Sequence, residues 1–411
     1  MSANSTRPFW VLLHRWFGLA VAVFLFIAGV TGAVISWDHE LDAWLNPQLY
    51  YSKTPGTPRP SLELVAIVET ADPRVRATYV PLNVQPGEAL GISVTPRRDP
   101  NIGKLYEVDY NEVALDPVSG EIQGRRFWGE ISLTRENLLP FLYKLHYSMH
   151  IPEGGGIEWG IWFMGIIGIV WVLDCFIALY LSFPKLQSWR KSFAFRWREG
   201  GARLNFDLHR SGGVWVWLFL LLLAVTSVSM NLNTEVMRPV VSWFSTLSPS
   251  PFVSRTPVAP ENAVEPQMSP SQIIAIAQAE AAKRSWTAPA GGVFYSPEFG
   301  VYGVGFFEPG NSHGNGGLGN PWLYFDAQTG APAGADVPGE GTAGDIFMQA
   351  QFPLHSGRIL GIPGRVFISV MGLVVGMLSV TGVVIWAKKR KARVSQSRRS
   401  TVEPGMAADS L

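Results

Sequence analysis

The amino-acid sequence predicts a membrane protein with four transmembrane helices, arranged as two parallel helix–domain–helix repeats that carry two periplasmic α+β domains. Three observations predict this fold. Four apolar runs are each long enough to cross a bilayer, which takes about 20 residues per helix. A Leu-His-Arg tripeptide stands at the start of the first and third runs. Two long polar segments separate the runs in the same order in each half of the chain, as expected of a duplicated unit.

The apolar runs are Trp10–Trp37, Ile157–Phe183, Val214–Leu232 and Val366–Trp386. The chain is 47 % hydrophobic and carries a formal net charge of +1, but its basic residues gather in segments 185–210 and 388–399. By the positive-inside rule both segments face the cytoplasm, so both termini are predicted to be cytoplasmic. Because these segments flank apolar spans, we expect the lipid bilayer as their partner and no nucleic acid.

The predicted division follows from the spans. It comprises span 10–37, periplasmic domain 38–156, span 157–183, cytoplasmic linker 184–208, span 209–232, periplasmic domain 233–362, span 363–387 and cytoplasmic tail 388–411. The first run is too long for a signal peptide and lacks a small-residue cleavage site. We therefore expect both outer domains to be held by true spans.

The two outer segments follow one plan. Each begins with a Pro-rich stretch and a helix-like run, continues with short strand-like runs, and closes on an Asp…Gly turn. The first has a helix at 61–71, strands at 77–80, 89–95 and 105–115, and a turn at 115–121. The second has a helix at 270–284, strands at 292–295, 301–307 and 322–325, and a turn at 325–331. The loop 310–320 is one place where the second half is longer.

Histidines mark the predicted chemistry, because five of the seven lie at predicted membrane boundaries. His14 and His209 stand 195 positions apart, from 14 to 209, and each has a glycine four residues on, at Gly18 and Gly213. Positions i and i+4 share one helix face, so a flat group held by the imidazole would meet no side chain one turn away. Histidines also collect at interfaces as polar side chains, but the repeated positions favour ligation.

Neutral imidazole suits haem iron, zinc or copper. Zinc needs three or four clustered ligands, often with cysteine or carboxylate. Cys175 is the only cysteine, so a covalently attached haem is excluded. Two axial imidazoles from two helices suit a six-coordinate haem that transfers electrons. These considerations predict haem b held without a covalent bond, at two haems per chain.

The predicted inner haem has His14 and His209 as axial ligands, and the predicted outer haem has His146 and His355. His150 lies one turn from His146 on a predicted helix 135–150, so it is either the alternative outer ligand or a contact to a propionate or substrate. Arg15 and Arg210 are candidate partners of haem propionates, although positive-inside placement explains them equally well.

Three other polar residues are weaker candidates for a functional site. His39 has no histidine at the matching position of the second half, and His313 lies in a Gly/Asn-rich loop where solvent exposure is expected. Asp174 is a carboxylate within the second run, and such residues are costly enough to indicate function by default. A proton path and a structural pairing with a polar neighbour both account for it.

Several short motifs together resemble the PepSY-associated transmembrane proteins, iron-regulated inner-membrane proteins of Gram-negative bacteria. They are Leu13-His14-Arg15, Glu40-Leu41-Asp42 with Asn46-Pro47, Leu115-Asp116 with Gly120-Glu121, Leu145–His150, Leu208-His209-Arg210, and Leu354–Gly357 with Gly364-Arg365. The resemblance covers nearly all of the chain. It implies PepSY-like outer domains, b-type haem and reduction of ferric siderophores in the periplasm. The first half departs from the pattern, because Gly154–Glu158 has no arginine where Arg365 stands in the second half.

The expected function is therefore an oxidoreductase that takes electrons from a cytoplasmic or quinol donor and reduces a ferric siderophore. Hard oxygen ligands hold Fe(III) more tightly than Fe(II), so reduction releases the iron. Two alternatives remain open at this stage. One is a haem-containing redox subunit that serves a periplasmic partner enzyme. The other is a non-enzymatic, membrane-anchored PepSY regulatory module, which would bind no haem.

Overall fold

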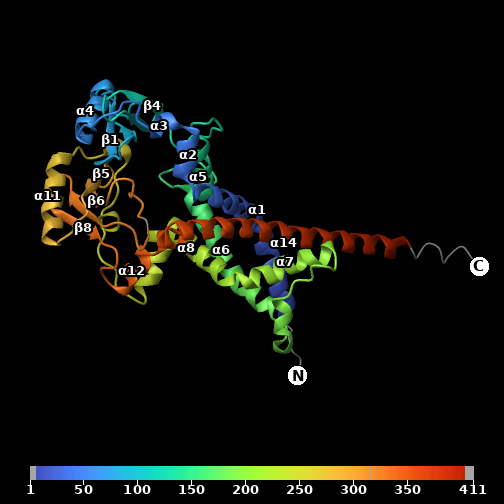
Figure 1. Cartoon of the computed structure of the whole chain (residues 1–411). Coiled ribbons are helices and arrows are strands. Elements are labelled where there is room, and N and C mark those ends of the chain that lie inside the picture. The colour runs from blue at the N-terminus through green and yellow to red at the C-terminus, as the bar shows by residue number, and fades with distance from the viewer. Residues whose placement is uncertain (1–5, 315, 403–411) are drawn as a thin grey trace, which may run out of the picture. The chain divides into compact units, whose positions relative to one another are not determined.

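The computed structural model describes residues 6–314 and 316–402. The chain divides into two compact units, coloured along the chain in Figure 1. The first, which we name the helical unit, comprises Met1–Val34, Leu145–Asn231 and Phe367–Leu411. The second, the sheet unit, comprises Ile35–Lys144 and Leu232–Val366. Each unit is described below by itself.

Three helices are long and apolar enough to cross a membrane, which supports a transmembrane protein. They are α1 (Arg7–Ile35), α6 (Trp159–Ser182) and α14 (Ile362–Val402), whose apolar part ends before a basic tail. The third predicted run is not one straight helix. It begins at the end of α7 (Gly201–Trp215) and continues through α8 (Trp217–Asn231). These two helices are bent by 72° at the break, and the pair counts as a fourth span only if it crosses as one. The Gly212-Gly213 pair in the last turn of α7 weakens the helix just before the bend.

Glycines let two helices of this unit cross closely. A Cβ added to Gly29 of α1 would lie 2.5 Å from the carbonyl oxygen of Gly372 on α14. Such small-residue contacts are typical of helix pairs in membranes, where close van der Waals packing replaces the hydrophobic effect. Gly29 and Gly372 therefore fix the distance between the first and last long helices.

The sheet unit contains one antiparallel sheet with the strand order β4-β3-β2-β1-β5-β6-β7-β8. The central pair is β1–β5, in which Val80 lies opposite Val293. The strands are β1 (Val75–Pro81), β2 (Leu90–Pro96), β3 (Glu112–Leu115), β4 (Ile122–Arg126), β5 (Ala290–Ser296), β6 (Val301–Phe306), β7 (Trp322–Asp326) and β8 (Pro332–Asp336). The strand order is symmetric about the centre, and each half is a four-stranded meander.

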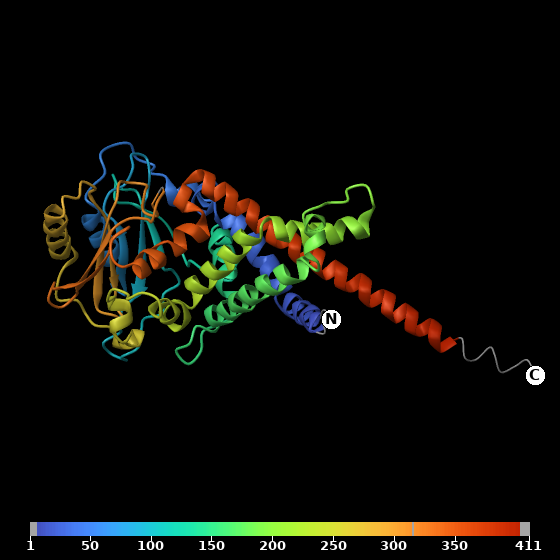
Figure 2. The ribbon, with the colours of Figure 1, turned by 90° about the horizontal axis from the view of Figure 1, so that it is seen from below.

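Two helices cover one face of this sheet and close its core (Figure 2). They are α4 (Ser61–Ala71), which buries Leu64 and Val68, and α11 (Pro270–Lys283), which buries Ile273 and Ala277. The remaining helices are short: α2 (Asp38–Leu45), α3 (Pro47–Tyr50), α5 (Leu138–Ser148), α9 (Arg238–Ser242), α10 (Pro251–Ser254), α12 (Ala343–Gln349) and α13 (Gln351–Ser356).

The helices predicted at 61–71 and 270–284 are confirmed, and six of the strands overlap the predicted strand-like runs. The run 105–115 is only partly right, because the ladder begins at Glu112. Strands β4 and β8 were not predicted. Their sequences, IQGRR and PAGAD, contain glycine, charge and few β-branched residues, so only pairing with the neighbouring strand identifies them.

The helix predicted over 135–150 is wrong at both ends. Helix α5 begins at Leu138 and ends at Ser148, and both Met149 and His150 have φ of 52°. Pro152 lies two residues on and disfavours helical geometry in the residue before it. His150 therefore does not continue the helix, and the prediction that it shares a face with His146 by helical spacing fails.

Candidate cofactor site

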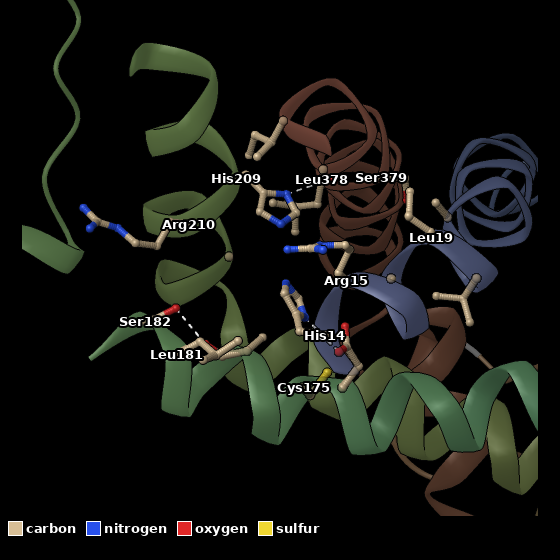
Figure 3. Close-up of a pocket in the computed structure, with 18 of the residues that line it drawn as sticks. His14, Arg15, Leu19, Cys175, Leu181, Ser182, His209, Arg210, Leu378 and Ser379 are labelled. Atoms are coloured by element: carbon tan, nitrogen blue, oxygen red, sulfur yellow. Dashed lines mark hydrogen bonds and ion pairs between the residues drawn. The ribbon is translucent and has the colours of Figure 1, made fainter. Parts of the chain in front are cut away.

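A cavity of about 440 Å³ opens among α1, α6, α7, α8 and α14 of the helical unit. We name it the His14–His209 pocket. Figure 3 shows His14 of α1 and His209 of α7 pointing toward one another across it. Its walls are mostly apolar and include Leu25, Trp171 and Leu220. A cavity of this size and character is typical of cofactor sites, which run to about 300–1,000 Å³.

The two imidazole rings that the sequence predicted as partners do lie together. Their centroids are 6.1 Å apart and their planes are inclined by 44°. Nδ1 of His14 lies 2.8 Å from Oδ1 of Asp174, a buried carboxylate on α6. Because a carboxylate accepts hydrogen bonds, this contact favours a proton on Nδ1 and leaves Nε2 as the lone-pair nitrogen.

His209 is oriented by the last long helix. Its Nδ1 lies 3.0 Å from the carbonyl oxygen of Leu378 and 3.2 Å from Oγ1 of Thr381. The Thr381 hydroxyl donates to the carbonyl of Met377, so its oxygen is available as an acceptor. A backbone carbonyl only accepts, so His209 also carries its proton on Nδ1 and presents Nε2 as a ligand. Metal-binding histidines are commonly held in this way by a carbonyl or carboxylate.

Glycines make room around both rings. A Cβ on Gly382 would lie 2.9 Å from Cε1 of His209, so the ring packs directly against the helix backbone there. A Cβ on Gly18 would meet no atom within 4 Å, and one on Gly213 would meet only Leu378 at 3.9 Å. Both of these glycines line the pocket, so the predicted open space one turn beyond each histidine is confirmed.

A second histidine of the helical unit is held by the same construction. Nδ1 of His146 on α5 lies 2.9 Å from the carbonyl oxygen of Ala28 and 3.2 Å from Oγ1 of Thr31. A Cβ on Gly32 would lie 2.9 Å from Cε1 of His146. We name the two arrangements the His209 cradle (Leu378, Thr381, Gly382) and the His146 cradle (Ala28, Thr31, Gly32).

The other predicted residues have different surroundings. Arg15 lines the pocket, and the structure records no ion pair for it among the described residues. Arg210 also lines the pocket, but it donates to the carbonyl of Lys191 at 2.5 Å and lies 3.8 Å from Asp207, so it is largely committed to its own segment. His355 lies on α13 in the sheet unit, so its pairing with His146 stays a prediction.

His39 and His313 both lie in the sheet unit. The His39 ring packs edge-on against Tyr50 at 5.1 Å between centroids. His313 is exposed, as expected, and lies beside Ser312. Within residues 6–314 and 316–402, no group of three or more His, Cys, Asp or Glu side chains is arranged to hold a metal ion. A zinc-type cluster is therefore not found there, whereas two facing imidazoles remain suited to axial ligation.

Thr31, Thr381 and Gly382 were missed as site residues. A signal existed, because Val-Thr-Gly occurs at residues 30–32 and again at 380–382, near the ends of the first and last apolar runs. The pairing of Asp174 with His14 was also open from sequence alone. The structure supplies the polar neighbour, because the Asp174 carboxylate lies 2.8 Å from Nδ1 of His14, and this contact fits both alternatives.

Several motif residues away from the pocket have architectural roles within the sheet unit. Arg365 pairs with both carboxylate oxygens of Glu40 at 2.6 and 2.7 Å and stacks over Trp37. The Arg365 guanidinium lowers the pKa of Glu40. Asp42 is buried and accepts hydrogen bonds from Asn46 and Tyr50.

No curated protein matches the chain. The family model described as the PepSY-associated TM region matches residues 11–389, a range that includes His14, Asp174 and His209. The chain therefore belongs to the PepSY-associated transmembrane family.

Proposed function

We propose that the protein is a haem-containing oxidoreductase of the bacterial inner membrane that carries electrons across the bilayer to ferric siderophores in the periplasm. One observation carries the proposal. His14 and His209, from two helices, face each other across an apolar cavity with ring centroids 6.1 Å apart. Membership of the PepSY-associated family is consistent with a membrane location.

The spacing of the rings fits two ligands of one metal ion. Metal–imidazole bonds are about 2.0 Å, so two imidazoles on opposite sides of one ion have ring centres roughly 6 Å apart. Among the described residues, Nε2 of His14 and of His209 makes no hydrogen bond, while each Nδ1 is occupied. The two histidines would therefore hold a six-coordinate haem b in this apolar slot.

The residues around the site would each have a defined task. Asp174, Leu378 and Thr381 hold the two imidazoles in the ligating tautomer. The open space beside Gly18 and Gly213 accommodates a flat ring system, and Arg15 is available for an anionic substituent such as a propionate. The apolar walls exclude water and so favour outer-sphere chemistry over ligand exchange. When bound, haem supplies reversible one-electron transfer.

The location of the sheet unit, the two repeats and the second haem are proposed from sequence patterns together with the cradles. The positive-inside rule gives cytoplasmic termini and places the sheet unit in the periplasm. The Leu-His-Arg repeat and the symmetric strand order suit two parallel repeats. The His146 cradle would hold a second haem with His355 as its other ligand, giving two haems per chain. An electron from a cytoplasmic or quinol donor reduces Fe(III) to Fe(II), and the siderophore then releases the weakly held ion.

The test is the absorption spectrum of the detergent-purified full chain, oxidised and reduced, with haem counted per chain. We expect a Soret band, sharp reduced α and β bands and about two haems per chain. His14→Ala should remove one haem, whereas His313→Ala, at an exposed position, should remove none. Reoxidation of the reduced sample by a ferric siderophore should be rapid.

Each alternative gives a different result in this experiment. A colourless protein from haem-replete cells would leave the anchored regulatory module as the better interpretation. Bound haem that ferric siderophores reoxidise only slowly would favour a redox subunit serving a periplasmic partner enzyme. Unchanged haem content in His14→Ala would show that the His14–His209 pocket has been misassigned.

A further inference from the structure

Charge is distributed unevenly in the walls of the His14–His209 pocket. Among the described residues, its lining includes one carboxylate, Asp174, which lies 2.8 Å from Nδ1 of His14. The cationic side chains of the lining are Arg7, Arg15, Arg210 and Lys389. The pocket therefore has an excess of positive charge that its own walls do not balance.

Two of these cations are available to a ligand. Arg7 donates to a backbone carbonyl at 2.8 Å, and Arg210 is committed to its own segment, as described above. Within residues 6–314 and 316–402, the structure records no side-chain hydrogen bond or ion pair for Arg15 or Lys389. Arg15 is half-buried and Lys389 is exposed. Figure 3 shows Arg15 extending into the pocket beside the two histidine rings.

The first and last long helices run antiparallel beside the pocket. A Cβ on Gly372 of α14 would lie 3.3 Å from Cβ of Ala33 on α1. A Cβ on Gly376, four residues on, would lie 3.6 Å from the ring of Phe26, seven residues back. The start of α1 and the end of the apolar part of α14 therefore lie toward the same end of the pocket, which the basic segments predict to be cytoplasmic.

The two available cations lie at this cytoplasmic end. Lys389 follows Gly382, which packs against His209, by seven residues, or about 10 Å along α14. Arg15 lies near the start of α1. In the opposite direction along α1 and α14 the lining is apolar and includes Val21, Leu25 and Val375. The pocket thus has a cationic end and an apolar end.

We propose that Arg15 and Lys389 bind the two propionates of the haem held by His14 and His209, so that its propionate edge faces the cytoplasmic end of the pocket. This inference rests on the proposed function and concerns this one site. Haem is a flat apolar macrocycle with two carboxylates on one edge, so its charge pattern complements a pocket that is cationic at one end and apolar at the other. Arginine binds a carboxylate through its planar fork, and lysine acts as a point charge.

Lipid phosphates are the other source of anionic groups at this end. Basic residues near a membrane surface attract anionic lipids, and the positive-inside rule by itself accounts for cations at the ends of spans. It does not account for cations that line the same cavity as two facing histidines. Carboxylates and phosphates are both anionic oxygen groups, so the experiment has to separate the two occupants.

The experiment measures the resonance Raman spectrum and the haem dissociation rate of the full-length protein in detergent. Lys389→Gln is the test, and Lys388→Gln is its matched control, because Lys388 is an exposed neighbour that does not line the pocket. We expect Lys389→Gln to shift the propionate bending band and to accelerate haem transfer to apomyoglobin by about two- to fivefold, the range for one exposed ion pair. The transfer phase that is absent from His14→Ala identifies the haem of this pocket.

Further variants and conditions show whether charge is responsible. Lys389→Arg keeps the charge and should behave like the wild type. Arg15→Gln, at a half-buried position, should accelerate the transfer by about tenfold, because the lost hydrogen bond is to a charged group. Raising the salt from about 0.1 M to about 1 M shortens the screening length from about 10 Å to about 3 Å, so the difference between the wild type and Lys389→Gln should shrink.

The inference and the proposed function fail in different ways. A Soret band in the wild type, with the propionate band unchanged in both Lys389→Gln and Arg15→Gln, overturns the propionate assignment and leaves the proposed function standing. Phosphatidylglycerol binding that depends on Lys389, without a shift of that band, assigns the cations to lipid and also overturns it. An equal effect of Lys388→Gln does the same, because general surface charge would then explain the result. Absence of a Soret band in the wild type removes the proposed function itself and is seen before any variant is compared.

Discussion

The His209 cradle and the His146 cradle have the same local geometry, but the surroundings described for the two histidines differ. In both, a histidine from a neighbouring helix donates to a carbonyl at 2.9–3.0 Å and reaches a threonine hydroxyl at 3.2 Å. In both, a glycine follows the threonine, and a Cβ added to that glycine would lie 2.9 Å from Cε1 of the histidine ring. His209 also faces His14 across the pocket, with ring centroids 6.1 Å apart, and His14 contacts a carboxylate.

The comparison separates two properties of the His14–His209 pocket, namely how an imidazole is oriented and which groups face it. The cradle orients an imidazole and sets its tautomer, and it can be reused wherever a Thr-Gly pair meets an incoming histidine. What faces the cradle then sets the chemistry of the site. Removing each part in turn from both cradles therefore tests whether they are equivalent.

The largest expected effect comes from removing the histidines themselves. His209→Ala and His146→Ala should each lower haem content from about two per chain to about one, because six-coordinate haem b held without a covalent bond depends on both axial ligands. Haem per chain measured by the pyridine haemochrome assay gives the result. The double variant should be colourless. Loss of both haems in either single variant would mean that the cradles are not independent.

The glycines should come next. Gly382→Ala and Gly32→Ala each place a methyl group against Cε1 of a histidine, which must move off its hydrogen bond. Disturbing such outer-shell geometry typically costs 10–100-fold in metal affinity. Haem dissociation measured by transfer to apomyoglobin should accelerate by about that factor. Gly376→Ala is the matched control on the same helix, because its Cβ would meet neighbours no closer than 3.6 Å. Equal dissociation rates in Gly382→Ala and Gly376→Ala would contradict the close-packing argument.

The sequence predicted more of the architecture than of the cradles. The pairing of His14 with His209 could be inferred because Leu-His-Arg occurs at the start of both the first and the third apolar run. The helix Ser61–Ala71 could be predicted because its apolar residues follow a helical period. The cradles could not be predicted from that repeat. They pair α1 with α5 and α14 with α7, so the Thr-Gly pairs near residues 31 and 381 do not follow the offset that relates His14 to His209.

Two further failures have local causes. Helical spacing predicts that His150 shares a helix face with His146, but the helix stops at Ser148. Only the backbone geometry beyond that residue reveals the stop. The acceptor of each Nδ1 is, in part, a backbone carbonyl, which leaves no trace in residue identity. Side-chain chemistry was therefore readable from the sequence, whereas the orientation of that chemistry required the fold.

The Asp…Gly turns of the sheet unit provide a second pair of equivalent sites, with a pH dependence. Burial alone would raise the pKa of Asp116, but hydrogen bonds from Ser119, Val118 and the 52–54 segment outweigh it, and the net pKa is lowered. The pKa of Asp326 is lowered in the same sense, with Thr329 and Arg255 as donors.

A lowered folded-state pKa stabilises the fold above the unfolded pKa of about 3.9, and that stability is lost as the pH falls below this value. Asp116→Asn should cost about 1–3 kcal/mol at pH 7 and flatten the pH dependence of unfolding below about pH 5. Asp326→Asn should cost less, because the Asp326 side chain is 22 % exposed whereas Asp116 is 1 % exposed as a residue. Thermal unfolding followed by tryptophan fluorescence measures both. A larger cost at Asp326 would refute the burial argument.

The smallest expected effect comes from the two threonines. Thr381→Val and Thr31→Val remove one acceptor of Nδ1 but leave the carbonyls of Leu378 and Ala28 in place. Each should cost about 0.5–1.5 kcal/mol of haem binding, because a neutral hydrogen bond is lost while the proton stays satisfied. The two costs, measured by the same haem-transfer assay, should agree, since the hydroxyl distances are both 3.2 Å. A clearly larger cost at Thr381 would mean that the facing pair of His14 and His209 strengthens haem binding at the His209 cradle. The two cradles would then be alike in geometry but not in energy.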